Sequence, residues 1–232
     1  MKKISKLLCS VLIMVTVFVM TSCTNTISID FSNKLANTNE YSFNIVYTDS
    51  TQETPIYISC YAKDGSYAYR FSKNSFDDGK LAYRQIFSDG TFYEISESKI
   101  LGVWKGEYKK TEEVAVTYEG NFMYKYTTSI TSGSFLTLFQ KGKEVEYNGV
   151  TCRQFDFAYD GKAYTYVFEN ETSNLLKFVL TTEDNVKTLE YSDYKFADID
   201  TDCLEIPSTS IGADGVQLYK EVDQLAYEFR IA

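Results

Sequence analysis

The sequence of 232 residues contains no histidine. Histidine is the side chain that most often serves as a general base or metal ligand near neutral pH, so its absence excludes Ser-His-Asp and Cys-His catalysis. Phosphate-cradling glycine loops and the Asp-x-Asp-x-Asp-Gly spacing of calcium loops are absent as well. Among 32 acidic residues, no pair stands out for glycoside cleavage. The sequence therefore predicts no enzymatic activity, no metal and no cofactor.

Basic residues and proline are also scarce. The 23 lysines and arginines are outnumbered by 32 acidic residues, which gives a formal net charge of −9. An acidic surface repels phosphate backbones, so nucleic acid is excluded as a partner. Two prolines beside 20 tyrosines and 16 phenylalanines are typical of a β-rich domain. After residue 20, no apolar run is long enough to cross a membrane.

The first 22 residues have the pattern of a signal peptide. Three lysines in the first six residues precede an apolar run over residues 7–20, which is short for a membrane span. Met20-Thr21-Ser22-Cys23 then resembles the lipobox of bacterial lipoproteins. In that family the cysteine is acylated on sulfur, and the peptide is cut before it. The alternative is an ordinary secretory signal, with Cys23 a plain thiol.

Lipid on Cys23 would decide the location of the protein. Each buried acyl CH₂ contributes about 0.8 kcal/mol, so two or three chains hold a protein without any other membrane element. We therefore expect a lipoprotein, palmitate-type acylated at Cys23, on the extracytoplasmic side of a bacterial cell membrane. The polar residues 23–39 are predicted to be a flexible tether, with a short helical turn over residues 32–38.

Three cysteines follow Cys23, namely Cys60, Cys152 and Cys203. The extracytoplasmic compartment permits disulfides. Cys152 and Cys203 could pair if the last strand lies near the strand that follows Asn148-Gly149. The other interpretation is that all three are small buried thiols, which suits Cys60 in its apolar run in particular.

The stretch from 55 to 104 predicts a meander of short strands. Apolar and polar residues alternate with period two, as in strands that are buried on one face. Asp64-Gly65, Asp78-Gly79 and Asp89-Gly90 separate the runs, and Asp-Gly supplies the positive φ of a tight hairpin turn. Asn148-Gly149 and Asp160-Gly161 repeat the pattern later in the chain. An antiparallel sheet is therefore expected over residues 40–207.

Two segments depart from the period-two alternation of apolar and polar residues. Phe135, Leu138 and Phe139 have helical spacing, which predicts a short amphipathic helix packed on the sheet. In the tail over residues 208–232, apolar residues three and four apart favour a helix, whereas alternation near the end favours a strand. We favour the helix. The acidic residues 198–202 are interpreted as a solvated loop, and Trp104 suits either a pocket or the core.

The order of these segments resembles the LolA/LolB-like lipoproteins, including small lipoproteins of Gram-positive bacteria. The resemblance rests on the lipobox, the helical insert and a series of strand and turn segments. These segments are residues 146–152, 160–166, 168–176 and 191–194, followed by Ile206-Pro207. It implies a mostly β (α+β) fold, in which a strongly curved antiparallel sheet forms an unclosed barrel with one or more short helices across its concave face. In better-known members the enclosed space holds acyl chains, and other members are sensory or scaffold domains.

We therefore expect a non-enzymatic protein that binds a hydrophobic or amphipathic ligand, such as a lipid, in this cavity. The candidate cavity residues are Tyr67, Tyr69, Phe71, Tyr83, Phe87, Phe135, Leu138, Phe139, Tyr164, Tyr166 and Phe168. Each of these side chains is equally compatible with an ordinary core. The alternatives are a sensor or scaffold domain that binds another cell-envelope protein, and a binder of wall polysaccharide through exposed tyrosines.

Overall fold

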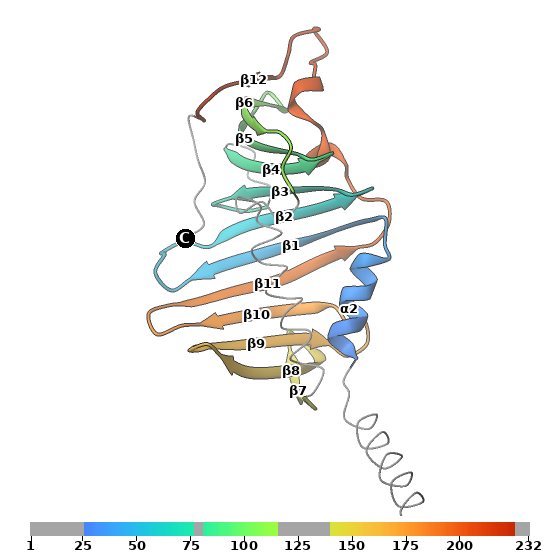
Figure 1. Cartoon of the computed structure of the whole chain (residues 1–232), viewed down its shortest axis with the longest axis vertical. Helices are drawn as coiled ribbons and strands as arrows, with labels where there is room; N and C mark the ends of the chain where they lie inside the picture. Colours follow the sequence, from blue (N-terminus) through green and yellow to red (C-terminus); the bar gives the residue numbers. More distant parts are fainter. Residues whose placement is uncertain (1–25, 77–80, 116–139, 226–232) are drawn as a thin grey trace, which may run out of the picture.

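The computed structural model describes residues 26–76, 81–115 and 140–225. Within these ranges the chain forms a sheet of 12 strands, with one α-helix lying against it (Figure 1). The strands follow the spatial order β12-β6-β5-β4-β3-β2-β1-β11-β10-β9-β8-β7, so the sheet has two free edges and does not close. The predicted fold class, mostly β with an unclosed sheet, is confirmed.

The first half of the sheet consists of β1 (Glu40–Asp49), β2 (Ile56–Lys63), β3 (Ser66–Ser72), β4 (Ala82–Ser88), β5 (Thr91–Ile100) and β6 (Val103–Thr111). The second half consists of β7 (Lys143–Tyr147), β8 (Val150–Tyr159), β9 (Lys162–Glu169), β10 (Leu175–Thr181) and β11 (Val186–Lys195). β1 pairs with β11 and joins the halves. All of these pairs are antiparallel, but β12 (Tyr219–Glu221) lies parallel to β6, which makes the sheet mixed.

The predicted hairpin turns have the backbone that they require. In Asp64-Gly65 the φ angles are 49° and 83°, and in Asp160-Gly161 they are 50° and 70°. Only residues that tolerate positive φ fit these two positions. Asp78-Gly79 lies outside the described residues. Leu101-Gly102 forms another such turn between β5 and β6, so the last residues of the stretch 55–104, Ile100 to Trp104, are not the single short strand that their sequence favours.

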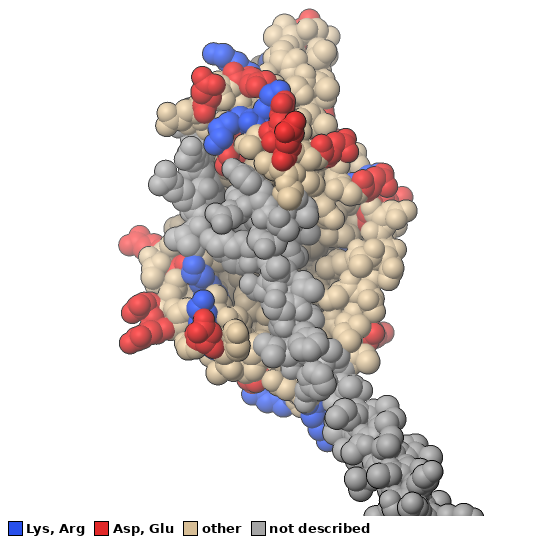
Figure 2. Space-filling model, in the orientation of Figure 1, with Lys and Arg blue, Asp and Glu red and all other residues tan. Residues whose placement is uncertain are grey.

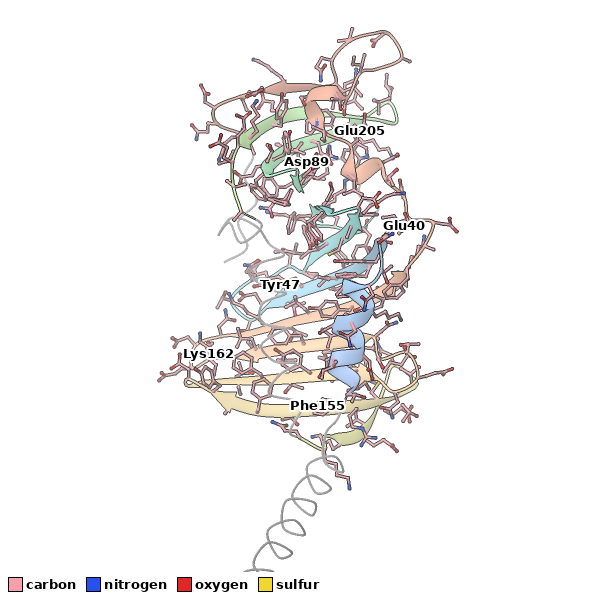
Figure 3. The ribbon with its side chains drawn as sticks, turned by 45° about the vertical axis from the view of Figure 1, so that its right-hand side comes forward. Glu40, Tyr47, Asp89, Phe155, Lys162 and Glu205 are labelled. Atoms are coloured by element: carbon pink, nitrogen blue, oxygen red, sulfur yellow. The ribbon has the colours of Figure 1, made fainter. Side chains whose placement is uncertain are left out.

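The main core lies on one face of the sheet, here called the first face. It includes the alternate side chains of β1–β3 and β8–β11, and most of its members are aromatic. Tyr47 in β1 and Phe155 in β8 belong to it, with exposures of 1% and 0% (Figure 3). This face is the one that period-two alternation predicted to be buried, but burial on one face only is wrong for β3–β5, where a second core lies on the opposite face.

The helix α2 (Ile27–Ala36) packs on the first face. Its Phe31 side chain is 1% exposed, and the ring contacts Phe168 and Tyr194 edge to face at centroid distances of 6.1 and 6.0 Å. A flexible tether was predicted for residues 23–39. The structure corrects this prediction for the residues of α2, because helical hydrogen bonds and the burial of Phe31, Ile27 and Leu35 together oppose the loss of chain entropy.

The chain beyond β11 crosses the opposite, second face. The 3₁₀ turns η1 (Asp202–Leu204) and η2 (Pro207–Thr209) lead to β12 at the edge of the sheet. Cys203 and Tyr219 are buried with Ile86 and Ile95 in a second core. As far as Leu225, the tail is therefore turn and strand, and the predicted C-terminal helix is wrong for this part. Residues 226–232 lie outside the described residues.

The three described cysteines, Cys60, Cys152 and Cys203, are buried free thiols. The proposed pairing of Cys152 with Cys203 is thereby overturned. Cys203 lies in η1, which contacts β2 and β3, whereas Cys152 lies in β8. Four strands separate β2 from β8, which places them roughly 24 Å apart at about 4.8 Å per strand. A disulfide needs Cα atoms within about 7 Å.

Candidate functional site

Several of the predicted site residues cannot be placed. Phe135, Leu138 and Phe139, and with them the predicted helical insert, lie outside the described residues, as do Cys23 and the predicted signal peptide. The part of the chain that the structure describes has no helix able to span a bilayer. Lipid anchoring at Cys23 therefore stays a prediction.

Most of the described candidates are core side chains. Tyr69, Phe71 and Tyr83 are 3%, 2% and 2% exposed, and Tyr166 and Phe168 are each 0% exposed. The rings pack on one another: Tyr166 stacks with Phe168 at 6.2 Å, and Phe71 contacts Tyr83 at 5.7 Å. Tyr164 and Tyr67 are partly buried against this core, and Phe87 is half-buried. The rings therefore fill the first face rather than line a wide cavity.

A pocket of about 670 Å³ lies between α2 and the first three strands. We call it the α2 pocket. It is lined by Phe31, Ser32, Asn33, Leu35, Ala36, Thr38, Asn39, Tyr41, Ala62, Lys63, Asp64, Gly65 and Tyr67. Its volume falls within the range of small-molecule sites, about 300–1,000 Å³. Of the described candidate residues, Tyr67 alone lines this pocket.

The α2 pocket combines apolar walls with polar side chains. Leu35, Tyr41 and Ala62 contribute apolar surface, and Lys63 and Asp64 contribute charge. Burial raises the pKa of Tyr41, so its hydroxyl stays protonated at neutral pH. A hydrogen bond to the Glu40 carboxylate, with an N–O distance of 2.8 Å, raises the pKa of Lys63. The pocket thus presents an apolar wall, a tyrosine that stays neutral, a lysine paired with Glu40, and the Asp64 carboxylate.

α2 was not predicted as part of this site, although the predicted helical turn over residues 32–38 overlaps it. Ile27, Phe31 and Leu35 recur at intervals of four residues, which is the spacing of one helix face. This helical spacing is present in the sequence, but the polar residues between Ile27, Phe31 and Leu35 favoured the prediction of a tether. The pocket needs the helix, because Phe31, Leu35 and Ala36 form one of its walls.

The second face holds a buried ion cluster. Arg84 and Glu97 are each 1% exposed, and Arg84 Nε lies 3.2 Å from Glu97 Oε2. Tyr219 donates its hydroxyl to the same carboxylate oxygen at 2.9 Å. A terminal nitrogen of Arg84 donates to the carbonyls of Cys203 and Glu205 at 2.8 and 3.1 Å. The cluster therefore binds the C-terminal segment to the sheet.

Among the described residues, no group of three or more Cys, Asp or Glu side chains is placed to hold a metal ion. The structure thus defines a class of molecule: an open, mostly β sheet, with one pocket of ligand size beside a helix on its first face and a charged second face.

No family model and no curated protein matches the chain. Among solved structures, it is similar to the lipoprotein LppX of Mycobacterium tuberculosis, with 8% identity, a TM-score of 0.43, and coverage of 75% of this chain and 94% of that one. A chain of the Pseudomonas aeruginosa MucA/MucB complex gives 14% identity and a TM-score of 0.43 over 79% of this chain and 62% of that one.

PNGF-II is also similar, with 8% identity, a TM-score of 0.33 and coverage of 79% of this chain. The chain spans 31% of the length of PNGF-II. At these identities and TM-scores, the similarities say nothing about what this chain binds, and its function has to be argued from its own residues.

Proposed function

We propose that this protein is a lipid-anchored protein of the cell envelope that binds an amphipathic molecule, such as a lipid or fatty acid, in the α2 pocket without changing it chemically. The observation that carries the proposal is the composition of the pocket. Phe31, Leu35 and Ala62 offer an apolar wall. Lys63, which is ion-paired with Glu40 at 2.8 Å, offers its remaining N–H donors to an acidic head group. Burial of an acyl chain against such a wall contributes about 0.8 kcal/mol per CH₂.

Binding of a fluorescent long-chain fatty acid to the full-length protein in detergent micelles tests this proposal. Ala36 is exposed at the end of α2 and lines the pocket, so Ala36→Trp fills the pocket with little strain on the core. Asn37 is its exposed neighbour and does not line the pocket, so Asn37→Trp is the matched control. We expect Ala36→Trp to weaken binding at least about tenfold and Asn37→Trp to leave it unchanged. Equal binding by both variants would contradict the proposal.

Docking to another envelope protein is a second candidate function, and the turn between β5 and β6 favours it. Ile100, Leu101 and Val103 are 54%, 99% and 42% exposed at this turn. Leu101 has a φ of 52°, a conformation that a leucine adopts only at some energetic cost. An exposed apolar turn of this kind is typical of a contact with an apolar groove on a partner.

Crosslinking in cells distinguishes this candidate. A photoreactive residue in place of Leu101 would capture one dominant protein if the turn docks. Replacement of Ile100 by Asp in that background would abolish the capture. A photoreactive residue at Tyr159, which is 66% exposed at the β8–β9 turn, is the matched control. The same set of captured proteins from both positions would remove the support for docking.

A further inference from the structure

A second pocket, of about 310 Å³, lies on the second face of the sheet and has a different chemistry. We call it the Arg70 pocket. Its lining includes Tyr61, Arg70, Lys99, Trp104, Asp200 and Asp202. Two formal positive charges and two formal negative charges thus meet in one pocket beside three aromatic rings, those of Tyr61, Phe76 and Trp104. The α2 pocket shares none of these residues, so the two sites are independent.

Arg70 is held rigidly in this pocket. Its Nε donates to Glu97 Oε1 at 3.0 Å, and its guanidinium lies over the Trp104 ring at 4.5 Å from the ring centre. The side chain is 17% exposed. Within the described part of the chain, its two terminal nitrogens donate to no acceptor. A fixed guanidinium fork with free N–H groups is the geometry that recognises a carboxylate or phosphate.

Asp200 and Asp202 place negative charge in the same pocket. Among the described residues, neither carboxylate forms an ion pair with a lysine or arginine. Lys99 likewise forms no ion pair with an aspartate or glutamate. Asp200 accepts the backbone N–H of Asp202 through Oδ1 at 3.0 Å, which fixes the turn. Burial raises the pKa of Tyr61, while Arg70 lowers it and Asp200 raises it further, so both charges act on this hydroxyl.

Arg70 is paired with Glu97 outside the pocket lining, but none of the four lining charges forms an ion pair with another, which limits the ligand that fits. A simple anion would satisfy Arg70 and be repelled by the two aspartates. A simple cation would satisfy the aspartates and be repelled by Arg70 and Lys99. Water could fill the pocket, but it supplies no charge to any of the four groups. A molecule that carries both signs a few bonds apart meets every one of them.

We infer that the Arg70 pocket binds a small zwitterion, with its acidic group on the Arg70 guanidinium and its ammonium group near Asp200 and Asp202. The aromatic rings of Trp104 and Tyr61 border the space left for the remainder of the ligand. Two sources supply this chemistry: a free α-amino acid, with a carboxylate, and the ethanolamine head group of a lipid, with a phosphate.

Calorimetry on the full-length protein in detergent micelles tests the inference. The probes are each of the common L-α-amino acids and O-phosphorylethanolamine, at concentrations up to millimolar. We expect at least one of them to bind. For an amino acid that binds, its N-acetyl and amide derivatives, each lacking one charge, should bind at least about tenfold more weakly. Binding of an amino acid alone identifies that source, and binding of O-phosphorylethanolamine alone identifies the head group.

Two variants test the residues. Arg70→Lys keeps the charge but loses the fork, and Asp200→Asn keeps the acceptor for the backbone N–H of Asp202 but loses the charge. We expect each to weaken binding at least about tenfold. Asp184→Asn is the matched control, because Asp184 is exposed at the β10–β11 turn and lies outside the pocket. Absence of binding by every zwitterion at millimolar concentration would overturn the inference. Wild-type affinity in both variants would overturn it as well.

Discussion

The two faces of the sheet bury different kinds of side chain: aromatic rings on the first face, and charged groups together with apolar ones on the second. On the first face, α2 adds an apolar side chain to a core of aromatic rings, with Phe31 against Phe168. On the second face, the C-terminal segment covers strand positions that carry charge, and Arg84 and Glu97 neutralise each other beneath it. In the view of Figure 2, acidic and basic side chains gather at the end of the molecule where β4–β6 lie. An apolar core can repack around a substituted side chain, whereas a buried charge is destabilising as soon as one of its partners is removed.

The largest effect is expected from breaking the buried charge pair. Glu97→Ala leaves Arg84 buried without a carboxylate, and Tyr219 loses its acceptor. Removal of one member of a buried ion pair lowers the free energy of unfolding by about 3–5 kcal/mol. Urea denaturation followed by tyrosine fluorescence measures this loss. The control is Glu112→Ala, at a side chain that is 62% exposed, and it should leave the midpoint unchanged. A midpoint of Glu97→Ala equal to that of the control would show that the cluster contributes nothing.

The contribution of the aromatic core on the first face is tested by a substitution in α2. Phe31→Ala removes a ring that is 1% exposed, which should lower the free energy of unfolding by about 3 kcal/mol. Limited proteolysis should also cut residues 27–36 faster than in the wild type. Asn33→Ala, on the exposed side of the same helix, is the control and should change neither quantity. Wild-type stability of Phe31→Ala would mean that this segment is a tether after all.

A smaller effect is expected from Asp49, a buried carboxylate at the end of β1. Burial alone would raise its pKa, but hydrogen bonds from Thr51, Asn185 and Tyr47 outweigh burial and lower it from 3.8 to about 2. The carboxylate therefore contributes stability above pH about 4, and this is lost as the pH falls towards about 2. The difference between the unfolded and folded pKa values of Asp49 corresponds to about 2 kcal/mol of stability.

Urea denaturation of the wild type and of Asp49→Asn over this pH range measures the contribution of Asp49. The variant should be less stable by about 2 kcal/mol at neutral pH, and the difference should vanish near pH 2. A difference that is constant over the range would show that the ionisation of Asp49 does not contribute. Asp184→Asn serves as the control with the same chemical change at an exposed position.

No effect at all is expected from reduction. Burial raises the pKa of the Cys60 thiol well above its usual value and that of Cys203 to about 11, so both are unreactive when folded. Adding dithiothreitol to air-oxidised protein should leave Tm unchanged, whereas loss of a native disulfide would lower stability by about 2–5 kcal/mol. Alkylation followed by mass spectrometry should label these thiols only after unfolding. A fall in Tm on reduction would restore the Cys152–Cys203 pairing.

The sheet could be predicted because its signals are local. Alternation places Tyr69 and Phe71 on one face whatever surrounds them, and Asp64-Gly65 fixes its turn by backbone geometry alone. The parallel strand β12 could not be predicted, because a three-residue strand is defined by its partner β6 and not by its own sequence.

The candidate sites were harder to predict than the sheet. Arg70 and Arg84 alternate with apolar residues, a pattern typical of a solvent-facing side of a strand, yet the C-terminal segment covers their face. Whether a charged strand position is buried depends on a segment more than a hundred residues away, which no local pattern encodes. Trp104, for which both a pocket and a core position were open, lines the Arg70 pocket.

The early start of α2 limits how far the domain can move from the bilayer. If Cys23 carries lipid, only residues 24–26 separate it from Ile27, and four extended steps of the chain reach at most about 14 Å. The domain would then rest close to the head groups, oriented by the N-terminal end of α2. The ten residues of α2 rise about 15 Å. Ala36, which lines the α2 pocket, therefore lies at the end of the helix that is farther along the chain from Cys23.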